Sequence, residues 1–480
     1  MRSSIWNGPR AAERLAEGAA LRESVFDAAD PACWLELDTG IRRSVRSSAD
    51  GTWLPAWQRT ERGRTLADAV RRGDALTDPQ LALALCHQDG RIRKRALART
   101  EGRPELLPLV VLRCADWAEP VRDRARLRWA EAVTVETAVA LAPLALRIGV
   151  RHRGDFAVGL VDRALRSADR EALLPLLTHA DRTVRRFAHR LAVEEGFLSP
   201  AELARSAAQD SDTVVQGLCA EAALAALAKG AADETVRETL LGARNPRVRS
   251  AGVTALRRDG QGERAVGFLG DRAGVVRACA RYVVRQLGGD PVEWYRGRCA
   301  DAVAVSAGVV SGLAECGDRT DAAVLWALTS HPDPVVRARA VSGLRTLDVL
   351  DVRRLRALLD DPAPAVVREA TLALVPSARM VDDGWLLERL AVERARETRV
   401  SAFRLLTAQG GIVRLRAAVA LVDDPDDKLR HWARQSVQRW HPTADVTPGT
   451  VEVGELFERA RHLFSDHVLK RRMWEAGLRA

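Results

Sequence analysis

The stretch HPDPVVRARAVSGLRTL, residues 331–347, contains the pattern that decides the fold of this chain. Asp333 can accept a hydrogen bond from the free amides of a helix start, and the proline after it is tolerated in the first helical turn. From Val336 onward, apolar or small residues recur every three or four positions, which places them on one helical face. The stretch therefore predicts an amphipathic helix that packs one face against its neighbours.

Versions of this stretch recur along the chain and align on an arginine that follows Val, Ile or Leu. A small residue stands three positions after the arginine in nearly every copy, and small residues at a fixed helical position let helices approach closely. Asp or Asn, which cap helix starts, precedes it by four positions in half of the copies. From Arg93 to Arg430 there are 337 residues in eleven steps, a mean period near 31. The aligned arginines are Arg93, Arg122, Arg185, Arg249, Arg277, Arg337, Arg368 and Arg430.

A period of this length with one amphipathic unit per repeat is typical of a solenoid, in which each unit buries its apolar face against its neighbours. The pattern of Asp, three residues, then Arg after an apolar residue, with a small residue three later, resembles the HEAT repeat. The resemblance is to the short variety also found in phycobilin lyases, and it covers about three quarters of the chain. It implies an all-α superhelix of about 12 two-helix repeats.

Two terminal regions do not follow the period. Residues 1–77 hold four of the twelve tryptophans, Trp6, Trp34, Trp53 and Trp57, and residues 441–480 predict one or two helices. Because the end units of a solenoid must cover an otherwise exposed apolar face, we expect a Trp-containing cap over 1–77 and a helical cap over 441–480. The HEAT-like solenoid then spans 78–440. Alternatively, the tryptophans form an aromatic docking site, or the C-terminal helix docks in a groove of a partner.

The sequence contains no signal for a membrane span, a metal site or an enzyme. No run of 18 apolar residues exists, and the N-terminus lacks the apolar core of a secretory signal. The seven cysteines form no C-x-x-C pair, and the nine histidines form no H-E-x-x-H motif. Nucleophile elbows, phosphate-binding loops and dinucleotide fingerprints are missing too. We therefore expect a cytoplasmic protein without metal or cofactor, and favour a binding protein over an enzyme.

The net charge of +10 belongs to the repeats, since residues 81–440 hold 56 basic and 46 acidic residues. The chain is arginine-rich, since only four of its basic residues are Lys. The HEAT resemblance implies that a repeat arginine bonds to an Asp or to backbone carbonyls of the adjacent repeat. On this basis we interpret as structural the arginines Arg93, Arg122, Arg185, Arg337, Arg368 and Arg430.

A second set of arginines suits the binding of an anionic partner. Arg277, Arg281 and Arg285 recur every four residues and so form one stripe along a helix. Arg249, Arg257 and Arg258 lie one repeat earlier. The resemblance implies that the second helix of each pair lines a concave face, and the arginine fork binds carboxylate or phosphate bidentately. A solvated helix edge in an arginine-rich protein explains the stripe equally well.

Two functions remain open from the sequence. The first is a cytoplasmic scaffold that binds a protein partner along the concave surface. The second is nucleic-acid binding through the arginine stripes, including a DNA glycosylase-like reaction, because HEAT-like alkylpurine DNA glycosylases place an Asp and aromatic residues on their concave surface. The candidates for that reaction, Asp116 with Trp117 and Trp129, or Trp294 with Tyr295, have no supporting motif.

Overall fold

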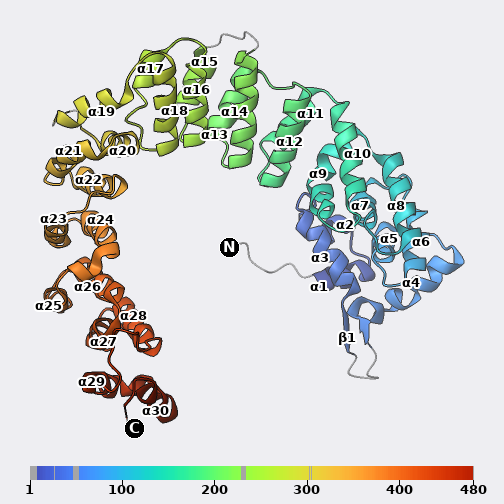
Figure 1. Ribbon diagram of the computed structural model, residues 1–480. Coiled ribbons are helices and arrows are strands. Elements are labelled where there is room, and N and C mark those ends of the chain that lie inside the picture. The colour runs from blue at the N-terminus through green and yellow to red at the C-terminus, as the bar shows by residue number, and fades with distance from the viewer. Residues whose placement is uncertain are drawn as a thin grey trace. The chain divides into compact units, whose positions relative to one another are not determined.

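The fold is an all-α solenoid, as predicted (Figure 1). The computed structural model describes residues 8–25, 27–46, 53–228, 234–301, 303 and 305–478, so Trp6 lies outside the described residues. Within these ranges the sheet content is one antiparallel hairpin, β1 (Ser44–Arg46) and β2 (Trp53–Pro55), which pairs Ser44 with Pro55 and Arg46 with Trp53.

Twelve consecutive helix pairs, α5/α6 to α27/α28, follow one another among the described residues. The chain forms two compact units, Met1–Arg244 and Asn245–Ala480, with the division between α15 and α16. The first unit contains α1 (Gly8–Glu17), α2 (Leu21–Ser24), α3 (Pro31–Arg42), α4 (Glu61–Arg72), α5 (Asp78–Leu85), α6 (Gly90–Leu97), α7 (Leu107–Arg113), α8 (Glu119–Ala132), α9 (Val135–Gly149), α10 (Asp155–Arg166), α11 (Arg170–Leu177), α12 (Arg182–Glu194), α13 (Pro200–Gln209), α14 (Thr213–Ala228) and α15 (Glu234–Leu241).

In the second unit, the second helices α22, α24 and α26 lie along one side and the first helices α21, α23 and α25 along the other (Figure 1). Successive second helices pack on one another, as α20 does on α22 and α22 on α24. This unit contains α16 (Pro246–Ala255), α17 (Gly262–Val266), α18 (Gly274–Gln286), α19 (Pro291–Ala300), α20 (Ala307–Cys316), α21 (Ala322–Leu328), α22 (Pro334–Thr346), α23 (Val352–Ala357), α24 (Pro364–Leu374), α25 (Asp383–Glu388), α26 (Arg396–Gln409), α27 (Gly411–Ala420), α28 (Asp427–Gln438), α29 (Val451–Arg459) and α30 (Asp466–Glu475).

The two ends of the array share their hydrophobic core with the adjacent repeats. Trp34 and Trp57 are buried, and their indole N–H groups donate to the carbonyl oxygens of Ala28 and Ile41 at 2.9 and 2.8 Å. Trp53, by contrast, is 66% exposed. At the other end, Phe457 and Leu469 are buried in the same cluster as the last repeats. The terminal segments thus pack against the adjacent repeats, and the predicted cap bounds at 77 and 440 stay a prediction.

Candidate partner-binding site

The arginine of the quoted stretch joins its own loop to the loop of the next repeat. Arg337 donates through Nε and Nη2 to both carboxylate oxygens of Asp361, at 3.0 and 2.9 Å. Its Nη1 donates to the carbonyl oxygens of His331 and Pro332, at 2.9 and 3.1 Å. Asp361 Oδ1 in turn accepts from the Ala363 amide at 2.8 Å, which orders the start of the next second helix. One guanidinium thus satisfies polar groups of two consecutive loops.

Five such pairs form what we call the arginine–aspartate ladder. In each pair the arginine is four residues after the N-cap of its helix, and the aspartate is two residues before the N-cap of the next second helix. The pairs are sheltered from solvent, and a hydrogen bond to a charged group in such a place is worth about 1.5–3 kcal/mol. The ladder pairs are Arg93–Asp116, Arg185–Asp210, Arg249–Asp271, Arg337–Asp361 and Arg399–Asp424.

The aspartate that pairs with each ladder arginine is not identified by the sequence analysis. This aspartate lies in the next repeat, six residues before the position that aligns with the arginine. The signal is present, because Asp or His recurs there in eight loops. Where it is His, the ring Nδ1 accepts from the amide two residues later, as at 3.0 Å between His331 and the Asp333 amide. Asp and His therefore serve the same turn, and the position holds His87, Asp116, His179, Asp210, Asp271, His331, Asp361 and Asp424.

The six arginines predicted to bind a partner fall into two groups. Arg249 is in the ladder, and Arg277 and Arg281 both pair with Glu315 of α20. Burial opposes ionisation of Glu315, yet these two guanidinium groups hold its pKa below the usual range. These three arginines are thus held inside the fold. Arg257, Arg258 and Arg285 are exposed, and the binding role of the set stays a prediction.

The arginines interpreted as structural also differ among themselves. Arg93, Arg185 and Arg337 are in the ladder. Arg122 and Arg430 donate to the carbonyl oxygen six residues back, at 3.1 and 2.6 Å. Among the residues that the structure describes, neither side chain pairs with a carboxylate of the next repeat.

Arg368 departs from the pattern. The N-cap of α24 is Ala363, so the slot four residues later is Val367, which is buried. Arg368 stands one residue further, about 100° round the helix. Its side chain is 64% exposed, and its ion pair is a 3.3 Å contact with its neighbour Glu369. The structure thus places outside the ladder an arginine that the sequence alignment puts inside it.

Arg368 instead lines a groove of about 460 Å³ over the second helices α24, α26 and α28. We call this the basic groove. Arg396 also lines it and pairs with Asp426 at 2.7 Å. The exposed side chains of Arg404 and Lys428 have no ion pair or hydrogen bond within the described part of the chain. The lining is completed by Pro364, Ala365, Val367, Glu397, Val400, Ser401 and Trp432.

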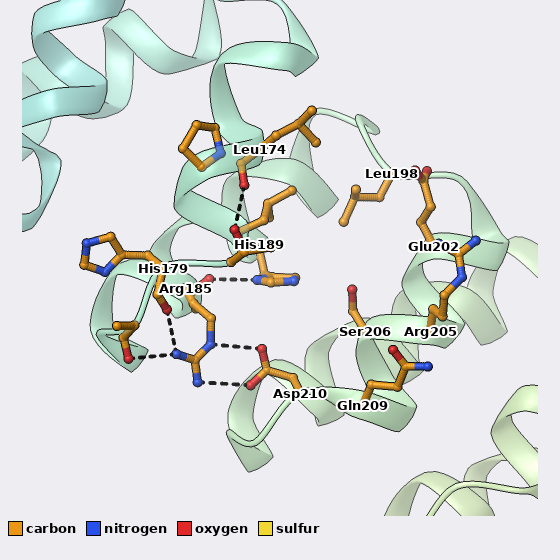
Figure 2. A pocket seen from close by; sticks show the side chains of 14 residues that line it. Leu174, His179, Arg185, His189, Leu198, Glu202, Arg205, Ser206, Gln209 and Asp210 are labelled. Carbon is orange, nitrogen blue, oxygen red and sulfur yellow. Dashed lines mark hydrogen bonds and ion pairs between the residues drawn. The ribbon is translucent and has the colours of Figure 1, made fainter.

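A second groove, of about 800 Å³, lies in the first unit between α11 and α13, with α12 as its floor (Figure 2). We call it the α11–α13 groove. One wall is apolar and comes from the end of α11, and the other is polar and comes from α13. Its residues include Leu174, Leu177, His189, Leu198, Glu202, Arg205, Ser206, Gln209 and Asp210.

The residues considered for a glycosylase-like reaction do not form a reactive site. Asp116 has a side chain that is 1% exposed and accepts from both Arg93 and Arg113. Trp117 is 70% exposed, whereas Trp129 is fully buried. In the other candidate pair, Tyr295 is buried and its hydroxyl donates to the Leu269 carbonyl oxygen at 2.7 Å. Asp116 and Tyr295 are thus both held by contacts within the fold.

Within the described ranges, no group of three His, Cys, Asp or Glu side chains is placed to hold a metal ion. In the same ranges, none of the helices combines the length and the apolar character needed to cross a bilayer.

Comparisons with known proteins identify no family for the chain. No protein-family model and no curated protein sequence matches it. Solved structures with a similar helical arrangement include a chain from the structure of Kap95p with RanGDP, at 10% identity and a TM-score of 0.44, covering 98% of this chain and 72% of that one. Importin beta in an ammonium sulfate condition is 11% identical with a TM-score of 0.29, and the match covers 98% of this chain and 87% of that one. Kap121p is 13% identical with a TM-score of 0.28, and the match covers 90% of this chain and 53% of that one. At these scores the likenesses carry no conclusion about binding.

Proposed function

We propose that this protein is a cytoplasmic interaction scaffold that binds an acidic segment of a protein partner in the basic groove. The observation that supports it is the exposure of Arg368, Arg404 and Lys428 in one groove, while the ladder satisfies most other repeat arginines internally. Within the described part of the chain, Arg404 and Lys428 have no internal ion pair to give up when they pair with a carboxylate of a ligand. Arg368 would give up an exposed 3.3 Å contact with Glu369, and exposed pairs contribute little to stability.

The floor of the basic groove adds an apolar component. Trp432 is half-buried, and Val400 beside it is half-buried too. Tryptophan and arginine are the residues most enriched at the energetic centres of protein interfaces. An acidic segment that also carries an apolar side chain would therefore use both the charges and the indole.

Two observations favour a protein segment over a nucleic-acid backbone. Asp427, beside Lys428, has a side chain that is 90% exposed, and Glu397 is 42% exposed at the groove itself. These carboxylates would repel a continuous row of phosphates, whereas a peptide can place its acidic residues between them. Of the six arginines predicted to bind a partner, Arg249, Arg277 and Arg281 are also held in ion pairs within the fold. The resemblance of the repeat to those of phycobilin lyases stays a prediction, and we propose no lyase chemistry from it.

The test is binding of a fluorescent 15-residue peptide of glutamates with one central leucine, measured by anisotropy at low and moderate salt. The double variant Arg368→Glu/Arg404→Glu should weaken binding at least tenfold. A matched control, Arg91→Glu/Arg353→Glu, changes the net charge equally at exposed positions away from the groove and should retain the wild-type affinity. Equal losses in both variants, no binding at low salt, or stronger binding of duplex DNA than of the peptide would each contradict the proposal.

A further inference from the structure

His189 places a hydrogen-bond acceptor inside the α11–α13 groove. The residue is 3% exposed, and its Nδ1 is 2.9 Å from the Arg185 carbonyl oxygen. Because a carbonyl oxygen can only accept, Nδ1 carries the proton and Nε2 has a free lone pair. Burial lowers the pKa of His189, which keeps the ring neutral at neutral pH. In Figure 2 the ring extends from α12 toward Ser206 on the opposite wall.

Most of the charges around the groove are already paired. Arg185 pairs with Asp210 at 3.0 Å. Glu202 accepts from the hydroxyl and the amide of Ser199 and from Arg170, and these bonds lower its pKa to about 2. Arg205 is exposed and, within the described part of the chain, has no ion pair or hydrogen bond. Among its groups, the groove therefore offers a positive charge on Arg205 and a hydrogen-bond acceptor on His189 Nε2.

The wall formed by α11 is apolar and partly open to solvent. Leu174 is 44% exposed and Leu177 is half-buried on that wall. Leu198 is also half-buried and adds an apolar side chain on the other side of the groove, just before α13 (Figure 2). The opening exists because α11 packs on α9 and α12, while α13 packs on α14 and α15. The apolar surface between the two first helices is thus left for a ligand side chain to cover.

We propose that the α11–α13 groove binds a second protein segment, one that inserts an aliphatic side chain against Leu174, Leu177 and Leu198 and places a carboxylate beside Arg205. A hydroxyl or amide of the same segment donates to His189 Nε2. This site lies in the first unit, shares no residue with the basic groove and does not depend on the function proposed for that groove.

The three contacts together determine which segments fit. An aliphatic side chain alone gains the energy of burial, which is not selective. A segment without a donor would cover His189 Nε2 and leave a buried acceptor unsatisfied, and sites built around a hydrogen bond reject analogues that lack it far better than apolar pockets reject a missing methylene. The carboxylate of the bound segment adds selectivity for acidic segments, because it pairs with Arg205, the exposed arginine of the groove.

The experiment is a peptide array in which one Leu, one Ser and one Asp are placed at spacings of zero to four residues in a Gly/Ala background. We expect one spacing to bind best, and binding to fall at least tenfold when Leu becomes Ala or Ser becomes Ala. Replacing Asp by Asn should weaken binding to the wild type but not to Arg205→Glu. His189→Phe keeps the ring volume and should abolish the preference for Ser over Ala.

Occlusion of the groove provides a second readout. Ser206→Trp fills the groove from an only partly buried position on α13, so the variant should fold normally, as circular dichroism can verify, and should lose the selected peptide. The variant Arg368→Glu/Arg404→Glu should bind that peptide as the wild type does. Equal affinity of the peptide for wild type and Ser206→Trp, or no array member bound at millimolar concentration, would overturn the proposal without affecting the basic groove.

Discussion

Arg337 and Arg368 occupy the same slot in the sequence alignment but have opposite roles in the structure, and replacing each by methionine tests this. Arg337 makes two bonds to Asp361 and two to backbone carbonyls, and the side chains of the pair are 13% and 9% exposed. Breaking a fully buried ion pair costs about 3–5 kcal/mol. Because this pair retains some exposure, we expect Arg337→Met to cost about 2–3 kcal/mol. Arg368→Met should cost less than about 1 kcal/mol, since exposed pairs contribute little.

The assay is amide hydrogen exchange read by mass spectrometry, because repeats open locally and a single unfolding free energy does not describe a long array. A cost of 2–3 kcal/mol corresponds to a loss of protection of about 30- to 140-fold. We expect this loss in peptides covering the loops at 330–337 and 359–366. Both variants remove one positive charge, so each is the control of the other. Similar protection in the two variants would refute the ladder as a source of stability.

Three further predictions concern other parts of the array. Arg186 hydrogen-bonds Asp212 and lowers its pKa to about 2, so its contribution to stability should be complete above about pH 4, where an unfolded Asp is ionised, and should fade as the pH falls toward 2. Hydrogen-exchange protection of α12 and of the start of α14 in wild type and Arg186→Met should accordingly converge at the acidic end. Gly312→Ala should destabilise α20 by about 1–3 kcal/mol, measured by hydrogen exchange, since its Cβ would lie 2.2 Å from the buried Tyr295 ring. His331→Asp should leave protection of the α22 start unchanged, because Asp accepts from the same amide in other loops; a large loss would contradict the equivalence.

The fold could be predicted because each repeat of a solenoid carries the same residue pattern, which recurs along the sequence at a nearly constant spacing. The apolar spacing and the capping Asp of each second helix are local features, and the structure forms caps at Asp89, Asp181, Asn245, Asp333 and Asp426. The burial of Trp34 and Trp57 depends on contacts between segments that the period does not include.

The candidate site could be predicted less well, because it depends on which arginines find internal partners. The partner of Arg277 and Arg281 is Glu315, 38 and 34 residues away, on the helix α20, which contains no arginine. The residue at which α24 begins decides whether Arg368 faces the next repeat or the solvent. Val366 and Val367 are both apolar, so alignment on the arginine and alignment on the helix start differ by one residue, and only the second gives the correct face.

The most direct test of the basic groove is fluorine NMR of the protein labelled with 5-fluorotryptophan, with the Trp432 signal assigned from Trp432→Phe. The acidic Leu-containing peptide should shift this resonance saturably, and Arg404→Glu should abolish the shift while leaving the spectrum otherwise unchanged. A peptide that binds without moving the Trp432 signal, or a neutral peptide of equal length that moves it as far, would contradict the assignment of the groove as the partner-binding site.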